Sequence, residues 1–191
     1  MSESWRLFWG LELPESTRRA LAAAIAPARR AAPQLRWTPS ESWHVTLCFL
    51  GEVDAARVAE VIAAGGRAAA HALAPLELEL SGRGRFPARG APRIYWVGCG
   101  GEVARLCAAA SELSLEMLGL GFSIDVDPLV PHVTLARAPR RGRREALEWN
   151  EPLDLGEARR FPVAEWVLYR SELEARGPRY RVLARTPFGR S

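Results

Sequence analysis

Apolar and polar positions along the chain follow two periods, and segments of the two kinds alternate. LELELS at residues 76–81 alternates with a period of two, which predicts a strand with one buried face. Apolar runs bounded by Gly, Pro or polar residues predict further strands at 5–13, 43–50, 93–99, 132–136, 161–169 and 180–186, with short extended pieces at 35–38 and 124–127. Gly51 predicts a turn after the strand at 43–50, and the Gly/Pro/Arg-rich stretch 82–92 predicts a loop.

Helical spacing of apolar residues occurs three times, at 15–32, 54–73 and 102–118. Pro27 predicts a break in the first helix, because proline lacks an amide hydrogen and crowds the preceding turn. Asp54 is placed to cap the second helix. Because strands and helices alternate through both halves of the chain, we expect two similar β-rich lobes with helices packed outside.

Two of the predicted strands carry the same short motif. Residues 43–47 read WHVTL and residues 131–135 read PHVTL, in a chain that has only three histidines. Side chains on a strand point alternately to its two faces. Each motif therefore presents two apolar anchors on one face and, on the other, an imidazole beside a hydroxyl: His44 with Thr46, and His132 with Thr134.

The composition narrows the chemistry that these motifs can serve. The chain has 191 residues, 48% hydrophobic and 25% charged, which suits one globular domain over residues 1–191. Its net charge is +4, and all 26 basic residues are arginine. The absence of lysine excludes a Walker-type phosphate loop, a ligase that forms a lysyl-adenylate from ATP, and a Schiff-base enzyme. The arginine surplus is compatible with a partner that carries phosphate.

Nothing in the sequence indicates export or membrane insertion. The N-terminal segment MSESWRLFWGLEL lacks the pattern of a signal peptide, and no stretch reaches the roughly 20 apolar residues of a membrane span. The three cysteines, Cys48, Cys99 and Cys107, form no CxxC pair and are expected to be reduced thiols. We therefore expect a cytoplasmic protein that is a monomer.

Two opposed imidazoles suit acid–base catalysis. With an unperturbed pKa of about 6.5, one histidine can accept a proton while the other donates one. Two threonine hydroxyls can donate hydrogen bonds to the non-bridging oxygens of a phosphate between them. The pattern indicates phosphodiester cleavage without a metal, carried by His44 and His132 with help from Thr46 and Thr134.

Other interpretations of the histidines remain open. A histidine on a strand is often structural, although two in the same His-x-Thr context are harder to explain in that way. Zinc needs three or four ligands, and neither an HExxH motif nor a Cys/His cluster completes His44 and His132. Asp125 and Asp127 precede the second motif, where a polar turn is favoured over cation binding. No GxSxG motif supports a Ser-His-Asp triad, and His71 in AAAHALA is expected on a helix surface.

The paired HxTx motifs resemble those of the 2H phosphoesterases, a superfamily named for its two histidines. Within it, the chain is similar to the bacterial and archaeal RNA 2′,3′-cyclic phosphodiesterases, historically called 2′-5′ RNA ligases. The resemblance covers nearly the whole chain through these segments: RLFWGLELP (6–14), WHVTLCFLGEV (43–53), PRIYWVG (92–98), PHVTLAR (131–137), FPVAEWVLYRSEL (161–173) and GPRYRVL (177–183).

This resemblance implies a bilobal α+β fold, with two pseudo-symmetric antiparallel β-sheet lobes, outer helices and the active site in a central cleft. It implies hydrolysis of a 2′,3′-cyclic phosphate at an RNA end to a 2′-phosphomonoester, without a cofactor or metal. His44 resembles the proton donor to the leaving 3′ oxygen, and His132 the proton acceptor that activates water. Thr46 and Thr134 match the phosphate-binding hydroxyls. Ligation would reverse the transfer and ranks second, because no ATP site is available.

Three further residues are candidates for substrate binding. Arg137 resembles a basic residue near the family's site, although strict alternation puts it on the face opposite His132. It reaches the substrate only if the strand ends or twists there. Phe8 and Phe49 could stack on a base, with core packing as the competing explanation. The basic run at 137–144 is either an RNA backbone contact or a solvated loop.

Two alternative functions accompany this hypothesis. The chain could be a phosphodiesterase for a small cyclic nucleotide, such as ADP-ribose cyclic phosphate. It could instead be a non-catalytic RNA-binding module that uses the arginine-rich loop. An assay on RNA with a 2′,3′-cyclic phosphate end separates the enzymes from the binding module.

Overall fold

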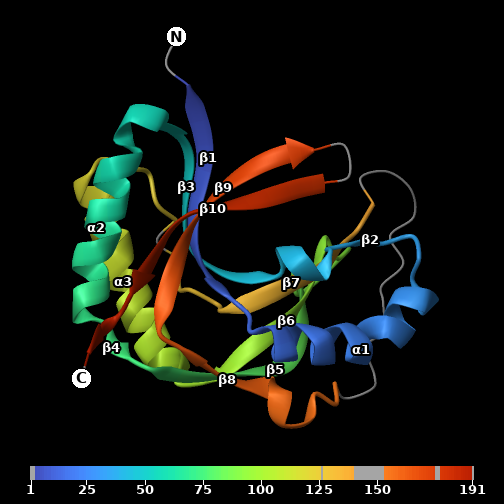
Figure 1. The fold of residues 1–191 in the computed structure, drawn as a ribbon. Helices are drawn as coiled ribbons and strands as arrows, with labels where there is room; N and C mark the ends of the chain where they lie inside the picture. Colours follow the sequence, from blue (N-terminus) through green and yellow to red (C-terminus); the bar gives the residue numbers. More distant parts are fainter. Residues whose placement is uncertain (1–2, 126, 140–152, 175–176, 191) are drawn as a thin grey trace.

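The computed structural model describes residues 3–125, 127–139, 153–174 and 177–190 and shows an α+β fold on a curled antiparallel sheet (Figure 1). The helices are α1 (Glu15–Ala31), α2 (Val58–His71) and α3 (Val103–Gly119), with 3-10 turns η1 (Ser40–Ser42), η2 (Ala55–Arg57) and η3 (Gly156–Arg159). The strands are β1 (Ser4–Glu12), β2 (Arg36–Trp37), β3 (His44–Asp54), β4 (Leu73–Ala74), β5 (Leu76–Phe86), β6 (Ile94–Gly101), β7 (His132–Arg137), β8 (Arg160–Val163), β9 (Glu165–Glu174), β10 (Gly177–Pro187) and β11 (Gly189–Arg190).

The main sheet has nine strands in the described part of the chain, and the two motif strands are in its middle. Its order is β10-β9-β1-β3-β7-β6-β5-β8, β2 adds to β7, and β4 and β11 form a separate parallel pair. All neighbours in the main sheet are antiparallel, and β3 meets β7 through the pair Val45 and Val133. The predicted α+β class with antiparallel sheets is confirmed. The sheets of the two expected lobes join into one sheet, with a motif strand on each side of the junction.

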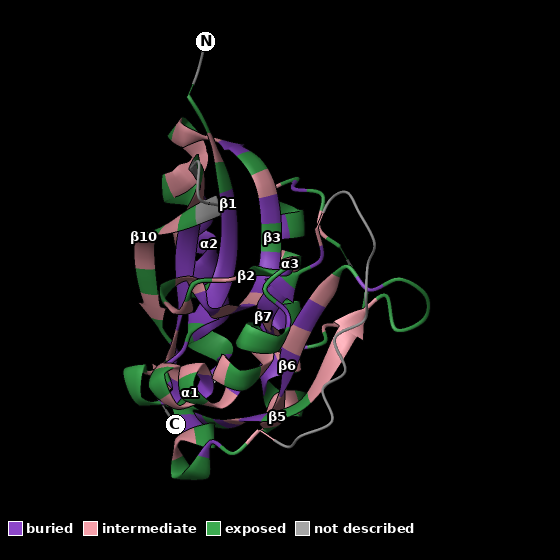
Figure 2. Ribbon diagram, turned by 90° about the vertical axis from the view of Figure 1, so that its right-hand side faces the viewer, coloured by how far each residue is buried: buried purple, intermediate pink, exposed green. Residues whose placement is uncertain are grey.

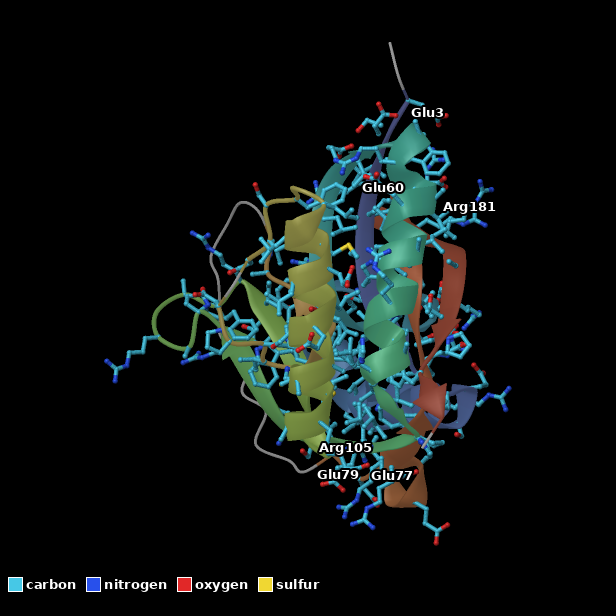
Figure 3. All side chains as sticks on the ribbon, turned by 90° about the vertical axis from the view of Figure 1, so that its left-hand side faces the viewer. Glu3, Glu60, Glu77, Glu79, Arg105 and Arg181 are labelled. Carbon is cyan, nitrogen blue, oxygen red and sulfur yellow. The ribbon has the colours of Figure 1, made fainter. Side chains whose placement is uncertain are left out.

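The helices cover the face of the sheet that the motif valines and leucines occupy. Helices α2 and α3 lie side by side (Figure 3), and Arg67 of α2 donates to Glu116 of α3 at 2.6 Å. Trp9 of β1 packs so closely on α2 that a Cβ built on Gly65 would lie 2.3 Å from its ring. Leu21 of α1 belongs to the same buried core. Burial is concentrated in the central strands (Figure 2), and the opposite face is left for the motif histidines.

The predicted break at Pro27 is wrong, because α1 continues without interruption to Ala31. Pro27 is exposed and stands one turn before the end of the helix, so its missing amide removes one hydrogen bond on the solvent side. Asp54 caps the 3-10 turn η2 that leads into α2, because its Oδ1 accepts from the amide of Ala56 at 2.9 Å, whereas the N-cap position of α2 itself is Arg57.

Two glycines that predict turns instead lie within strands. Strand β3 continues through Gly51, and β5 runs through Gly82 to Phe86 rather than ending before a loop. Gly51 and Gly82 have φ angles of 72° and 67°, at points where the register of each strand shifts. Such β-bulges use the left-handed conformation that glycine adopts without strain, so the strand bends instead of ending.

The remaining differences are small. The strand predicted at 161–169 is divided at Ala164 into β8 and β9. Residues 124 and 125 are irregular, and residue 126 lies outside the described residues, as does most of the basic run at 137–144. Within the described ranges, no helix has the length and apolar character needed to cross a membrane.

Candidate active site

Both motif strands contain a β-bulge at the same place in the motif. In β3 the pairing with β1 skips Leu47, and in β7 the pairing with β6 skips Leu135. The burial sequence of residues 44–49 is the same as that of residues 132–137: half-buried, buried, half-buried, buried, buried, exposed. The two motifs therefore share a local structure as well as a sequence.

The bulge decides where the residue five positions after each histidine points. Two consecutive side chains after each threonine face the core, so the next one returns to the histidine face. This residue is Phe49 in β3 and Arg137 in β7. Strict alternation would place Arg137 opposite His132, and the bulge at Leu135 is the physical reason that it does not lie there.

The β3–β7 junction brings the polar pairs together. Val45 pairs with Val133, the residue after each histidine, in antiparallel orientation. Continuing this register by one residue in each direction sets His44 opposite Thr134 and Thr46 opposite His132. The two imidazoles and two hydroxyls therefore form one group related by a local two-fold axis between the strands.

Each imidazole is oriented by the carbonyl two residues before it. His44 Nδ1 lies 2.8 Å from the Ser42 carbonyl oxygen, and His132 Nδ1 lies 2.7 Å from that of Val130. A carbonyl only accepts, so Nδ1 carries the hydrogen in both residues and Nε2 is the nitrogen that exchanges a proton. In the neutral form, the Thr46 hydroxyl donates to His44 Nε2 across 3.1 Å.

Aromatic rings from neighbouring strands surround the two imidazoles. Phe8, Tyr180 and Tyr169 lie 4.7, 4.8 and 5.9 Å from the His44 ring, measured between ring centroids. Around His132 the equivalent distances are 5.2 Å to Phe86 and 5.7 Å to Trp96. These rings exclude water from one side of each imidazole and restrict its rotation.

The pKa values of both histidines are lowered. Burial lowers the pKa of His44 from 6.5 to about 4, the hydrogen bond to Ser42 opposes this, and the positive charges of His132 and Arg137 lower it further. Burial also lowers the pKa of His132, opposed by the hydrogen bond to Val130 and aided by the charge of Arg137. Both imidazoles are therefore neutral in the free protein at pH 7, and Arg137 is close enough to act on both.

The two phenylalanines predicted as base-stacking residues occupy different environments. Phe49 is 41% exposed, and the Arg6 guanidinium lies 4.8 Å from its ring centroid. Phe8 is only 3% exposed, because it packs against Tyr169 and His44. Phe49 thus retains a surface that a planar ligand can contact, whereas Phe8 supports the imidazole.

Sequence reasoning did not identify Tyr169, Tyr180 or Phe86 as neighbours of the histidines. Tyr169 pairs with Phe8 across β9 and β1, and Tyr180 comes from β10, the next strand. These contacts depend on strand order, which the spacing of residues along the chain does not reveal. The only available signal was that each tyrosine lies in a segment used for the family resemblance.

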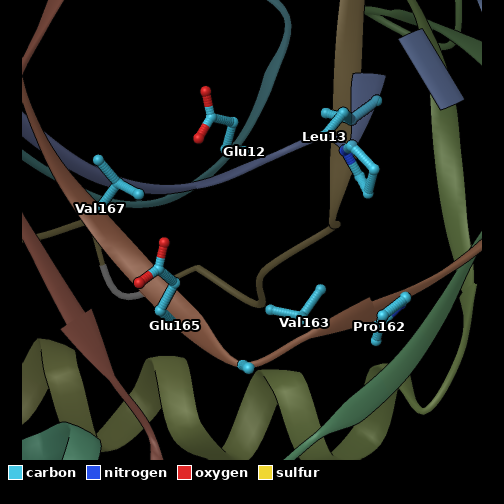
Figure 4. Close-up of a pocket in the computed structure, with 8 residues that line it drawn as sticks. Glu12, Leu13, Pro162, Val163, Glu165 and Val167 are labelled. Atoms are coloured by element: carbon cyan, nitrogen blue, oxygen red, sulfur yellow. The ribbon is translucent and has the colours of Figure 1, made fainter. Parts of the chain in front are cut away.

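A separate surface cavity of about 210 Å³ lies beside β1 and β9, and none of the motif residues line it (Figure 4). Glu12 and Glu165 border this cavity, and Arg185 binds both carboxylates at 2.7 and 2.9 Å. Because its polar lining includes two carboxylates, this cavity is a poor site for a phosphate.

The described residues contain no group of three or more His, Cys, Asp or Glu side chains that could hold a metal. Asp125 Oδ1 accepts from the amide of Asp127 at 3.1 Å, as expected for a polar turn. At the β3–β7 junction, the imidazole, hydroxyl and guanidinium groups can bind an anion and move protons.

Comparison with known proteins identifies the family. The sequence model of a protein family described as LigT-like phosphoesterase matches residues 11–96. The RNA 2′,3′-cyclic phosphodiesterase of Thermus thermophilus is 33% identical over 189 residues, covering 93% of this chain and 87% of that protein. The protein of the same name from Geobacillus stearothermophilus is 36% identical over 186 residues, which are 94% of this chain and 56% of the relative. The chain thus spans little more than half the length of that second relative.

Solved structures agree with these matches. A crystal structure of a Thermus thermophilus protein superposes with a TM-score of 0.77 and 31% identity, covering 96% of this chain and 97% of that one. Escherichia coli LigT complexed with 3′-AMP gives a TM-score of 0.79 and 25% identity, covering 97% and 99% of the two chains. With these similarities and the paired motifs at the centre of the sheet, the chain belongs to the LigT-like phosphoesterase family.

Proposed function

We propose that this protein is an RNA 2′,3′-cyclic phosphodiesterase, which opens the cyclic phosphate at an RNA end to a 2′-phosphomonoester. The observation that carries the proposal is the group of two imidazoles and two hydroxyls across the β3–β7 junction, each imidazole presenting Nε2. Its curated relatives from Geobacillus, Thermus and Methanocaldococcus bear this name.

In the proposed reaction, one histidine takes a proton and the other gives one. His132 Nε2 accepts a proton from water as the water oxygen forms a bond to phosphorus. The bond from phosphorus to the 3′ oxygen breaks, and His44 Nε2 gives its proton to that oxygen. The products are a 2′-phosphomonoester and a free 3′ hydroxyl. The family resemblance supplies the assignment of donor and acceptor, because the motifs themselves are equivalent.

The donor role requires that His44 gain a proton when the substrate binds. Its pKa of about 4 leaves it neutral in the free protein at pH 7, and an anionic phosphate beside the ring favours the charged form. Protonation of Nε2 removes the acceptor for the Thr46 hydroxyl. That hydroxyl is then free to donate to a phosphate oxygen, so binding of the anion and charging of the donor reinforce each other.

The phosphate would be held by hydroxyl and guanidinium groups. Thr46 and Thr134 donate to its non-bridging oxygens, and Arg137 neutralises charge on the same face. No step in this scheme uses a metal or an organic cofactor. Phe49 is the candidate surface for a base next to the phosphate, because its ring is the more exposed of the two predicted phenylalanines.

The test uses an RNA oligonucleotide that ends in a 2′,3′-cyclic phosphate, incubated with the protein and EDTA. We expect a 2′-phosphomonoester product, and losses in kcat of about 10²-fold or more in His44→Ala and His132→Ala. His71→Ala, at an exposed position at the end of α2, is the matched control. Absence of product from the unaltered protein would refute the proposal, and full activity in both motif variants would refute the assignment of residues.

The same substrates separate the alternatives. A non-catalytic RNA-binding module would keep its RNA affinity in both histidine variants and lose it with salt. A phosphodiesterase for small nucleotides would have a higher kcat/KM for ADP-ribose cyclic phosphate or a cyclic mononucleotide than for the oligonucleotide. In ligation, a 5′ hydroxyl would replace water as the nucleophile that opens the cyclic phosphate, and incubation with an RNA that bears this hydroxyl would detect the joined product.

A further inference from the structure

A row of side chains crosses four strands on the histidine face. Arg36 of β2 pairs with Arg137 of β7, Arg137 pairs with Ile94 of β6, and Ile94 pairs with Phe86 of β5. Directly opposite residues in antiparallel strands point to the same face. The Phe86 ring contacts His132, so the whole row, including Arg36, lies on the face of the motif histidines.

The adjacent row confirms this orientation. Trp37 follows Arg36 and pairs with Ala136, which in turn pairs with Tyr95. These three side chains pack together with Leu35 in a small cluster on the opposite face. Trp37 is fixed there because its Nε1 donates to the Ala32 carbonyl at 3.0 Å. With Trp37 held on one face, the exposed Arg36 projects from the other.

Arg36 and Arg137 face each other without a carboxylate. About half of the other arginines in the described part of the chain have ion-pair partners, for example Arg67 with Glu116 and Arg185 with Glu12. Within the same described ranges, neither Arg36 nor Arg137 forms a salt bridge. Side chains of like charge on directly opposite residues of a sheet destabilise it. An anion between or beside the two guanidinium groups would remove this repulsion.

The two arginines differ in their distance from the reacting group. The charge of Arg137 acts on both histidines and on Tyr180, so Arg137 faces the centre of the site. Arg36 lies one strand further out, on β2. The Arg36 guanidinium is therefore placed to bind the phosphate next to the reacting phosphate. This requires that the RNA chain leave the site over β7 and β2.

We propose that Arg36 binds the internal phosphate of an RNA substrate, next to its terminal cyclic phosphate, and so favours oligonucleotides over mononucleotides. This inference rests on the proposed function of the site. A cyclic mononucleotide has no second phosphate and leaves Arg36 without a partner. The bidentate geometry of guanidinium suits the two free oxygens of a phosphodiester.

The experiment compares Arg36→Gln with the unaltered protein on two substrates: a short RNA ending in a 2′,3′-cyclic phosphate, and the corresponding cyclic mononucleotide. Arg29→Gln is the control, because it removes the same charge from an exposed position on α1. Thermal unfolding of each variant verifies its fold. We expect kcat/KM for the RNA to fall about tenfold in Arg36→Gln. For the mononucleotide, kcat/KM of Arg36→Gln should stay within about twofold of the unaltered protein, and Arg29→Gln should stay within about twofold on both substrates.

The dependence on salt gives a second measurement. Losing one phosphate contact should reduce the slope of log KM against log salt concentration for the RNA by about 0.7, and Arg36→Lys should restore most of it. Equal losses on both substrates, or no loss on the RNA, would overturn the assignment. If the unaltered protein hydrolyses neither substrate, the proposed function fails first. Arg36 is then tested by fluorescence anisotropy with an uncleavable RNA, where unchanged affinity in Arg36→Gln overturns it.

Discussion

The stability of this protein should fall between pH 7 and pH 5 because one histidine is buried as a neutral group. The pKa of His44 is lowered from 6.5 to about 4 in the folded protein, chiefly by burial. The unfolded chain therefore takes up a proton below pH 6.5, while the folded protein does so only near pH 4. In that window the unfolded state binds more protons, so the free energy of unfolding decreases as the pH falls.

The size of the effect follows from the shift. One pKa unit corresponds to about 1.4 kcal/mol, so the full loss below pH 4 is about 3 kcal/mol. Between pH 7 and pH 5 the linkage relation gives a loss of about 2 kcal/mol from His44 alone. His132 has a lowered pKa as well and contributes in the same direction. Such a loss is a large share of the 5–15 kcal/mol that is typical of a folded domain.

Urea unfolding at several pH values measures this contribution. We expect the unaltered protein to lose about 2 kcal/mol more than His44→Gln between pH 7 and pH 5, because the variant has no imidazole to protonate at this position. Carboxylates titrate in both proteins and cancel in the comparison. His71→Gln should follow the unaltered protein. Equal slopes in His44→Gln and the unaltered protein, or an NMR titration of His44 centred near pH 6.5, would refute the reasoning.

Three further predictions concern single side chains. Arg137→Gln should raise the pKa of both motif histidines, because the guanidinium opposes their protonation, and NMR titration curves that do not move would contradict this. Gly65→Ala should lower the free energy of unfolding by about 1–3 kcal/mol, because the new alanine Cβ would overlap the Trp9 ring. In Gly66→Ala the new Cβ meets no atom within 4 Å, so a thermal melt should show a neutral or stabilising effect. Thr134→Val should reduce kcat/KM on a cyclic phosphate by about 10²-fold and Thr134→Ser far less, so equal rates would exclude a role for the hydroxyl.

Much of the fold could be predicted because hydrophobic periodicity reports which residues are buried. The strands predicted at residues 5–13 and 132–136 and the helix predicted at 102–118 end within one residue of the observed β1, β7 and α3. The errors arise at Gly and Pro. Gly51 and Gly82 predict the ends of strands, but a bulge uses the same left-handed glycine that a turn does. Local sequence does not distinguish the two, because the difference lies in whether a partner strand continues alongside.

The candidate site was predictable in its central residues and not in its surroundings. His44 and His132 stood out because a rare residue recurred in the same context, and the junction of β3 and β7 brings them together. Strict alternation puts Arg137 on the face opposite His132, so that it reaches the substrate only if the strand ends or twists. The bulge at Leu135 provides that change and places Arg137 on the histidine face. The sequence does contain a sign of this bulge. Two consecutive apolar residues, Leu135 and Ala136, precede Arg137 and interrupt the alternation of polar and apolar positions. The tyrosines beside His44 depend on the order of β1, β9 and β10, which only the folded chain reveals.

The two motifs are equivalent in sequence and local structure, so any difference in role must come from what surrounds them. The position after the bulge is a phenylalanine in β3 and an arginine in β7. Among the described residues, three aromatic rings lie against His44 and two against His132. His44 is therefore the more desolvated imidazole, and its charged form is the one that gains most when an anion replaces water beside it. A residue that becomes charged only when the phosphate arrives is suited to donate a proton. The neighbours of the motifs, rather than the motifs themselves, thus favour the same assignment of the proton donor as the family resemblance does.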